Sequence, residues 1–213
     1  MSITQVAVLD LYGTLLDTAA RHYAIYCLIT QSAQIQPLPL EVYWRYRREG
    51  STNLEVLIQN GLKSSNRRFA QSTWLKHIET IEMLKLDRLF PGAKKWLKKQ
   101  RGRVEFVLVT LRSNAQTLET QLEWLGISSY FRKVLVIPHQ TDATRAKAVA
   151  VMKNVEGGIL AWVGDSEVDI NAARQIGVKP IGVSAGIRTK KALAKAGAAE
   201  TYRMVTEIRN WQR

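Results

Sequence analysis

Short runs of apolar and β-branched residues recur along the chain, separated by polar and glycine-containing segments. Runs of this length and composition are typical of strands that are buried on both faces of a parallel sheet. Four runs are clear, and a fifth, nearer the end of the chain, has the same character. The predicted strands are residues 6–9, 104–109, 133–137, 159–163 and 180–183.

The segments between the later strands have the spacing of helices. Leu118, Leu122 and Leu125 follow one helical face and precede Gly126, and a second segment of this kind ends before Gly177. Glycine directly after the last apolar position is a common helix stop. Strands that alternate with helices indicate right-handed βαβ units. We therefore expect an α/β protein in which helices cover both faces of a parallel sheet.

Residues 18–91 interrupt this alternation, because their apolar positions follow helical spacing and none of their runs is a convincing strand. The interruption predicts an all-helical domain over 18–91, inserted into an α/β core domain formed by 1–17 and 92–213. Ligands of parallel α/β sheets bind at the carboxyl ends of the strands. An insert that leaves the sheet at the end of the first strand would therefore cover the site as a lid.

Composition indicates a folded chain in a reducing compartment. The 213 residues are 46% hydrophobic, which is enough for a substantial core. The single cysteine, Cys27, cannot form an intramolecular disulfide. The first residues lack the pattern of a secretory signal, and no apolar run reaches the roughly 18 residues of a membrane span. We expect a soluble cytoplasmic protein that is a monomer or a homodimer.

The chain carries a formal net charge of +13, from 31 Lys and Arg residues against 18 Asp and Glu residues. Such a charge is compatible with nucleic acid, an anionic membrane or an anionic small substrate as the partner. Ten basic residues fall in two runs, and without them the balance is 21 basic to 18 acidic residues. The first run is Lys94, Lys95, Lys98, Lys99, Arg101 and Arg103, and the second is Arg188, Lys190, Lys191 and Lys195.

The predicted elements give the two runs different surroundings. The first run covers the helix before the second predicted strand, so its later members lie toward the end of the sheet opposite the strand tips and complement the helix dipole. The second run begins on the active face, where its charges would attract an anion. Neither run has the aromatic interleaving of a nucleic-acid platform. We therefore expect a small anionic substrate, with no specific nucleic acid and no membrane as a partner.

Residues with chemical function directly follow the predicted strands. Asp10 follows the first strand, Thr110 follows the second, and Asp165 follows the fourth after one glycine. Asp169 comes four residues after Asp165, so the two lie on one face if a helix begins between them. Lys147 is placed on the helix before the fourth strand. Three carboxylates, a hydroxyl and an ammonium group in one crevice can hold Mg²⁺ and a phosphate together.

These motifs resemble those of the haloacid dehalogenase superfamily, and the resemblance covers nearly the whole chain. The matching residues, in the family's order, are Asp10 with Gly13, Thr14 and Asp17, then Thr110, then Lys147, then Gly164 and Asp165 with Asp169. The resemblance implies a Rossmann-like parallel sheet with an inserted helical cap. It also implies that Asp10 is the nucleophile and forms a covalent aspartyl intermediate, which divides one difficult displacement into two easier ones.

The resemblance further implies roles for the other matching residues. Lys147 would hold phosphoryl oxygens and offset the charge of Asp10. Mg²⁺ would be bound by Asp10, Asp165, Asp169 and the backbone carbonyl of Tyr12. Substrate and phosphate binding would fall to Gly13, Thr14, Thr110, Leu111, Arg112 and Lys147, where the guanidinium of Arg112 offers a fork of donors to a carboxylate or a phosphate.

Tyr12 departs from the pattern of the family's phosphatases, which carry there a second aspartate that protonates the leaving group and then activates water. General acid–base catalysis contributes about 10²- to 10⁴-fold in rate, so its loss predicts slow hydrolysis of ordinary phosphate monoesters. The 2-haloacid dehalogenases of the same family resemble this chain in having tyrosine there, since a departing halide needs no proton. Residues 164–169, in contrast, resemble the Mg²⁺-binding form of the phosphatases.

The two motifs favour different reactions, and each reaction would be impaired in a different way by the motif that does not fit it. A dehalogenase that kept Asp165 and Asp169 would hold uncompensated negative charge beside the nucleophile, which would raise the pKa of Asp10 and weaken it. A phosphatase with Tyr12 loses one proton-transfer group but keeps the nucleophile, metal and phosphate sites. The sequence therefore favours a Mg²⁺-dependent phosphohydrolase that is slow or limited to good leaving groups. A 2-haloacid dehalogenase and a catalytically silent anion-binding protein are the alternatives.

Overall fold

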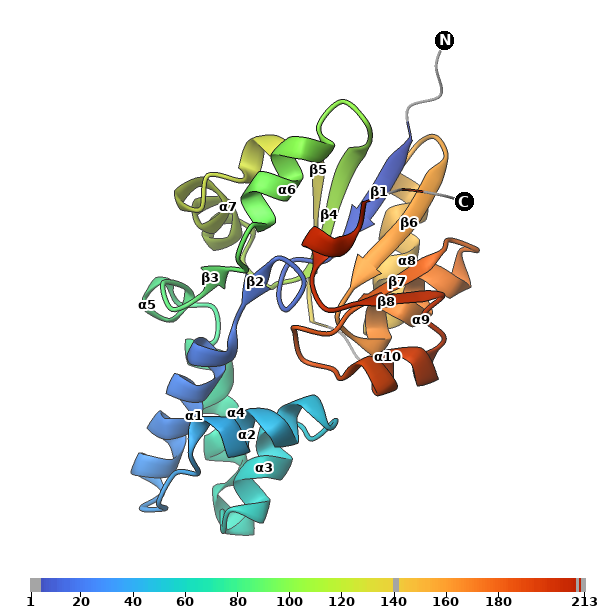
Figure 1. Ribbon diagram of the computed structural model, residues 1–213. Helices are drawn as coiled ribbons and strands as arrows, with labels where there is room; N and C mark the ends of the chain where they lie inside the picture. Colours follow the sequence, from blue (N-terminus) through green and yellow to red (C-terminus); the bar gives the residue numbers. More distant parts are fainter. Residues whose placement is uncertain (1–4, 140–141, 210, 212–213) are drawn as a thin grey trace. The chain divides into compact units, whose positions relative to one another are not determined.

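The computed structural model describes residues 5–139, 142–209 and 211 (Figure 1). The chain divides into two compact units, one formed by Met1–Asp17 with Leu89–Arg213 and the other by Thr18–Arg88. The second unit ends three residues earlier than the helical segment expected from the sequence. There the chain forms the short strand β3 (Arg88–Leu89), which pairs with β2 (Leu16–Asp17), so the inserted stretch is helical except at this return.

The larger unit is built on a six-stranded sheet in the order β5-β4-β1-β6-β7-β8, and all its neighbouring strands are parallel. This confirms the predicted α/β fold. The strands are β1 (Val6–Leu9), β4 (Glu105–Leu111), β5 (Phe131–Ile137), β6 (Ile159–Gly164), β7 (Pro180–Val183) and β8 (Glu200–Tyr202). The first five correspond to the five predicted runs, although β4 begins one residue later than the run predicted at 104–109, and β8 was not predicted.

Alternate residues of the central strands pack on opposite faces of the sheet, as the two-residue period of a strand requires. Ala7 and Leu9 of β1 pack on the face that is covered by α6 (Ala93–Gln100) and α7 (Ala115–Trp124). Val6 and Val8 pack on the other face, against α8 (Ala143–Asn154) and α9 (Glu167–Gln175). The continuous apolar runs are thus strands with two buried faces.

The strand order reverses at β1, because β4 and β5 lie on one side of it and β6, β7 and β8 on the other. In open parallel sheets, ligands bind beyond the carboxyl ends of the strands at such a switch point. The residues that follow β1 and β6 therefore meet in the crevice. The unit is completed by α10 (Lys190–Ala196) and the short 3₁₀ helices η2 (Ser128–Tyr130) and η3 (Val205–Glu207).

The smaller unit has its own core. Its helices are α1 (Ala19–Ser32), α2 (Leu40–Arg48), α3 (Asn53–Gln59), α4 (Arg67–His77), α5 (Ile81–Leu84) and the 3₁₀ helix η1 (Ser64–Asn66). The rings of Tyr26 and Tyr43 lie 4.5 Å apart at the centre of its apolar cluster. A buried ion pair joins Arg21 Nε to Asp87 Oδ1 at 3.0 Å. In the described part of the chain, no helix is both long enough and apolar enough to cross a membrane.

Candidate active site

The loop after β1 places Asp10 at the carboxyl edge of the sheet. It is a tight turn, in which the Leu11 carbonyl accepts from the Leu15 amide at 2.9 Å and the Leu16 carbonyl accepts from the Gly13 amide at 2.7 Å. Gly13 has φ +75°, and a Cβ atom there would overlap Asp165 Oδ2. Only glycine combines this conformation with so close an approach of the carboxylate.

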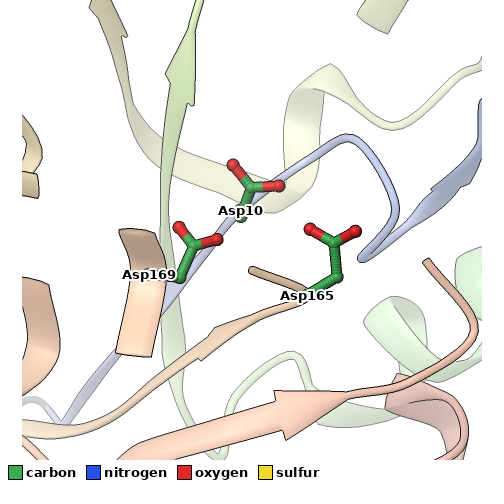
Figure 2. Close-up of side chains that lie close together, drawn as sticks. All are labelled: Asp10, Asp165 and Asp169. Atoms are coloured by element: carbon green, nitrogen blue, oxygen red, sulfur yellow. The ribbon is translucent and has the colours of Figure 1, made fainter. Parts of the chain in front are cut away.

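Asp10, Asp165 and Asp169 form one cluster, shown in Figure 2. Each offers a carboxylate oxygen within 4.8 Å of the other two, and all three side chains are buried. Asp165 comes directly after β6, and Asp169 lies in the first turn of α9. The structure therefore brings together the three carboxylates that the sequence selected from separate strand ends.

Backbone and hydroxyl donors fix the orientation of two of these carboxylates. Asp165 Oδ2 accepts a hydrogen bond from the Ile187 amide at 2.6 Å, and Asp169 Oδ2 accepts one from Ser166 Oγ at 2.6 Å. Sequence reasoning did not select Ile187 or Ser166. A backbone amide leaves no signature in the sequence, whereas Ser166, three residues before Asp169, fits the spacing of a hydroxyl at the start of a helix.

Lys147 of α8 lies between two of the three carboxylates. Its Nζ atom is 2.7 Å from Asp10 Oδ1 and 2.7 Å from Asp169 Oδ1, and its side chain is 3% exposed. A buried ammonium group that donates to two carboxylates orients both of them. The cluster thus holds three carboxylates and one ammonium group, a formal charge of −2 when all four are ionised.

Burial and mutual repulsion act on the ionisation of this cluster. Burial raises the pKa of Asp10, Lys147 lowers it and Asp169 raises it, which leaves it at about 7, above the ordinary 3.8. The pKa of Asp165 is raised well above its usual range by burial and by the charges of Asp10 and Asp169. Burial acts to lower the pKa of Lys147, but Asp10 and Asp169 outweigh it and raise that pKa.

A divalent cation fits these residues. Carboxylate oxygens are the preferred ligands of Mg²⁺, and a charge of +2 would offset the −2 of the cluster. Lys147 contacts Oδ1 of both Asp10 and Asp169, so it leaves Oδ2 of Asp10 for another ligand. Burial and the neighbouring carboxylates raise the pKa values of Asp10 and Asp165 despite the charge of Lys147, so a bound cation would favour the ionised forms of both.

Two threonine hydroxyls lie at the same edge of the sheet. Thr110, near the end of β4, is fully buried, and its Oγ1 atom has no hydrogen-bond partner among the described residues. A buried hydroxyl without a partner costs about 1–3 kcal/mol, so a ligand oxygen that accepts from it would recover this free energy. Thr14 Oγ1 donates to Asp10 Oδ2 at a longer distance of 3.4 Å.

The side chain of Tyr12 is held by α7. Its hydroxyl donates to Oε1 of the buried Gln121 at 2.7 Å. The guanidinium carbon of Arg112 lies 5.5 Å from the centroid of the Tyr12 ring, and Arg112 Nη2 donates to Thr117 Oγ1 at 2.9 Å. Thr117 and Gln121 were not selected from the sequence, although a spacing of four residues places them on one helix face.

The remaining expected residues have less distinctive surroundings. Leu111 ends β4 and is half-buried against the apolar cluster under α8 and α9. Arg188 was expected to help attract an anion, but its Nε atom lies 2.6 and 2.8 Å from the two carboxylate oxygens of Glu167. Its charge is therefore largely offset, and the remaining positive charge of the second basic run is that of the three lysines of α10.

Comparisons with known proteins agree with this architecture. A family model described as haloacid dehalogenase-like hydrolase matches residues 4–177. A phosphoglycolate phosphatase from Synechococcus elongatus is 24% identical over 195 residues, which cover 90% of this chain and 89% of the relative.

Two solved structures have the same fold as this chain. A haloacid dehalogenase-like family hydrolase from Streptococcus pneumoniae superposes with a TM-score of 0.72, at 16% identity and 94% coverage of both chains. A structure described as a predicted phosphoglycolate phosphatase from Haemophilus somnus gives 0.71, at 18% identity, with 98% of this chain and 97% of the other covered.

Proposed function

Because the chain belongs to the haloacid dehalogenase-like hydrolases, we propose that it is a Mg²⁺-dependent phosphohydrolase that acts on a small phosphorylated metabolite through an aspartyl intermediate on Asp10. The observation that carries the proposal is the buried cluster of Asp10, Asp165 and Asp169 with Lys147 between two of them. The phosphatase relative supports the choice of a phosphoryl group as the group that is transferred.

The reaction proceeds in two displacements. In the first, an Asp10 oxygen attacks phosphorus, and the bond between phosphorus and the leaving oxygen breaks with its electron pair on that oxygen. In the second, water attacks the phosphorus of the aspartyl phosphate, loses a proton to solvent, and releases phosphate and the Asp10 carboxylate. Mg²⁺ held by the three aspartates would offset the negative charge on the phosphoryl oxygens.

Lys147 and Thr110 support both displacements. Lys147 offsets the charge of Asp10, so that an anionic phosphoryl group can approach the nucleophile. The Thr110 hydroxyl, buried at the same sheet edge, is available to donate to a phosphoryl oxygen. Both groups are fixed by secondary structure before substrate binds, so little free energy is spent on reorganising them during the reaction.

Tyr12 determines which substrates react well. Its hydroxyl proton is donated to Gln121, and a phenol with an ordinary pKa near 10 is a weak base at neutral pH. An alkoxide leaving group would therefore depart without a protein proton donor, whereas a phenolate needs none. Water attack in the second displacement also lacks a base from residue 12. We therefore expect substrates with good leaving groups to react fastest, and we expect the aspartyl phosphate to accumulate.

The alternative is a 2-haloacid dehalogenase, which Tyr12 favours. Against it stands the ionisation of Asp10, because burial and then the charge of Asp169 raise the pKa of its carboxyl group to about 7. Less of the nucleophilic carboxylate is therefore present at neutral pH when no metal ion is bound. The two functions predict opposite metal requirements. Mg²⁺-dependent release of phosphate from an aryl phosphate supports the phosphohydrolase. Release of halide from 2-chloropropionate in EDTA supports the dehalogenase.

The test measures both products for the wild-type protein and for the Asp10→Asn variant. We expect p-nitrophenyl phosphate to be hydrolysed in Mg²⁺, the activity to disappear in EDTA, and Asp10→Asn to lose it. Glu119→Gln, which changes an exposed carboxyl group on α7, is the matched control and should leave the rate unchanged. Equal rates for wild type and Asp10→Asn, or halide release without phosphate release, would contradict the proposal.

A further inference from the structure

A hollow lies at the end of the sheet opposite the aspartate cluster. It has a volume of about 740 Å³ and is lined by the loop before β4, the first residues of β4, and the residues that lead from η2 into β5. Glu105 begins β4 and Thr110 lies five residues further along it, so at about 3.3 Å per residue the hollow is about 16 Å from the aspartate edge. It is therefore not part of the active site.

Positive charge dominates the lining of this hollow. Arg101, Arg103 and Arg132 line it, and all three are exposed. The one acidic residue of the lining, Glu105, pairs with Arg132, with 2.6 Å between Oε2 and Nη1. The lining thus has a formal charge of +2, and Arg101 and Arg103 lie outside that ion pair. Arginine forks of this kind bind phosphate groups with two donors each.

Aromatic and aliphatic side chains form the apolar part of the lining. Phe106, Tyr130 and Phe131 line the hollow together with the apolar side chains of Leu97 and Val104. Tyr130 and Phe131 are half-buried, whereas Phe106 is buried. A site that combines cationic forks with aromatic side chains is complementary to an anion that carries a flat apolar ring. Its volume is within the usual range for small-molecule sites, roughly 300–1,000 Å³.

We propose that this hollow binds a nucleoside phosphate, with the phosphates on Arg101 and Arg103 and the base against the half-buried Tyr130 and Phe131. The proposal is independent of the function proposed for the aspartate cluster, because the two sites share no residue. It also gives a role to the end of the first basic run. Lys94, Lys95, Lys98 and Lys99 lie on α6 and are not part of the lining, whereas Arg101 and Arg103 are.

The test is a calorimetric titration of the full chain with ATP in EDTA, so that metal-dependent binding at the aspartate cluster does not contribute. Two double variants are compared with the wild type. One carries Arg101→Ala and Arg103→Ala, and the matched control carries Lys98→Ala and Lys99→Ala. Each removes two positive charges, and all four positions lie within one six-residue segment. We expect the arginine pair to weaken ATP binding by at least about tenfold and the lysine pair by less than about twofold.

Further probes separate the chemical contributions. Tripolyphosphate, which lacks the base, should bind at least about fivefold more weakly than ATP, and Thr110→Val should leave ATP binding unchanged. The proposal is overturned if ATP does not bind, if the two pairs weaken binding equally, or if tripolyphosphate binds as tightly as ATP. It is also overturned if Thr110→Val weakens binding as much as the arginine pair, or if a single-stranded oligonucleotide binds far more tightly than ATP. Circular dichroism checks that each variant is folded.

Discussion

When no metal ion is bound, the aspartate cluster should lower the free energy of unfolding of the protein. Asp10 has a pKa of about 7 in the folded protein against 3.8 ordinarily, so the folded protein binds its proton more tightly than the unfolded chain does. A raised carboxyl pKa favours folding below pH 3.8, and this contribution is lost as the pH rises to 7. Above pH 7, the ionised Asp10 lowers the free energy of unfolding by roughly 4 kcal/mol relative to a neutral group of the same shape.

Asp10→Asn supplies that neutral group, and Lys147 keeps its second partner, Asp169. In EDTA we expect the variant to be more stable than the wild type by about 2 kcal/mol at pH 5.5 and by about 4 kcal/mol at pH 8. Urea denaturation at the two pH values measures this difference. Glu119→Gln, at an exposed position, should change the free energy of unfolding by less than about 0.5 kcal/mol at either pH.

Mg²⁺ should reduce the difference in stability between the two proteins. The ion compensates the carboxylates of the wild type, so millimolar Mg²⁺ should stabilise it by mass action, whereas Asp10→Asn should gain less. Three results would show that Asp10 does not destabilise the metal-free protein. These are a variant that is less stable than the wild type at pH 8 in EDTA, a difference that does not change between pH 5.5 and 8, and equal stabilisation of both proteins by Mg²⁺.

The remaining predictions concern the general acid, the Gly13 turn and the inserted unit. Tyr12→Asp should raise the steady-state Mg²⁺-dependent release of phosphate from an alkyl phosphate by about 10²-fold, and an unchanged rate would contradict the role given to residue 12. Gly13→Ala should abolish turnover of p-nitrophenyl phosphate, whereas Gly61→Ala, with positive φ but open space for a Cβ, should retain it. Arg21→Met should lower the free energy of unfolding by about 3–5 kcal/mol, because it removes the guanidinium that pairs with the buried Asp87 carboxylate, while the double variant with Asp87→Leu should recover most of this loss in urea denaturation.

Strands with two buried faces could be predicted because burial on both sides requires an unbroken apolar run. The runs at residues 6–9 and 180–183 match β1 and β7 to the residue. β8 escaped prediction because Glu200–Tyr202 is a short edge strand of half-buried residues, so its sequence contains no apolar run. It forms only because β7 offers it a free edge, and that depends on tertiary structure rather than on local pattern.

The residues of the candidate site could be selected from the sequence because the carboxyl ends of adjacent parallel strands lie at one edge of the sheet. Asp10 and Asp165 are far apart in sequence but follow the adjacent strands β1 and β6. What the sequence could not provide are contacts that depend on the path of the chain between elements. The Ile187 amide reaches Asp165 through a loop, and Gln121 accepts from Tyr12 across the face of the sheet that α7 covers.

Direct detection of the covalent intermediate tests the central claim that Asp10 is the nucleophile of a phosphohydrolase. The wild-type protein is mixed with p-nitrophenyl phosphate and Mg²⁺, quenched in acid within the first turnover, reduced with borohydride and analysed by peptide mass spectrometry. We predict reductive modification at residue 10 in the wild type, with none in EDTA and none in Asp10→Asn. If the wild-type protein released p-nitrophenol in Mg²⁺ without any modification at residue 10, Asp10 would not be the nucleophile.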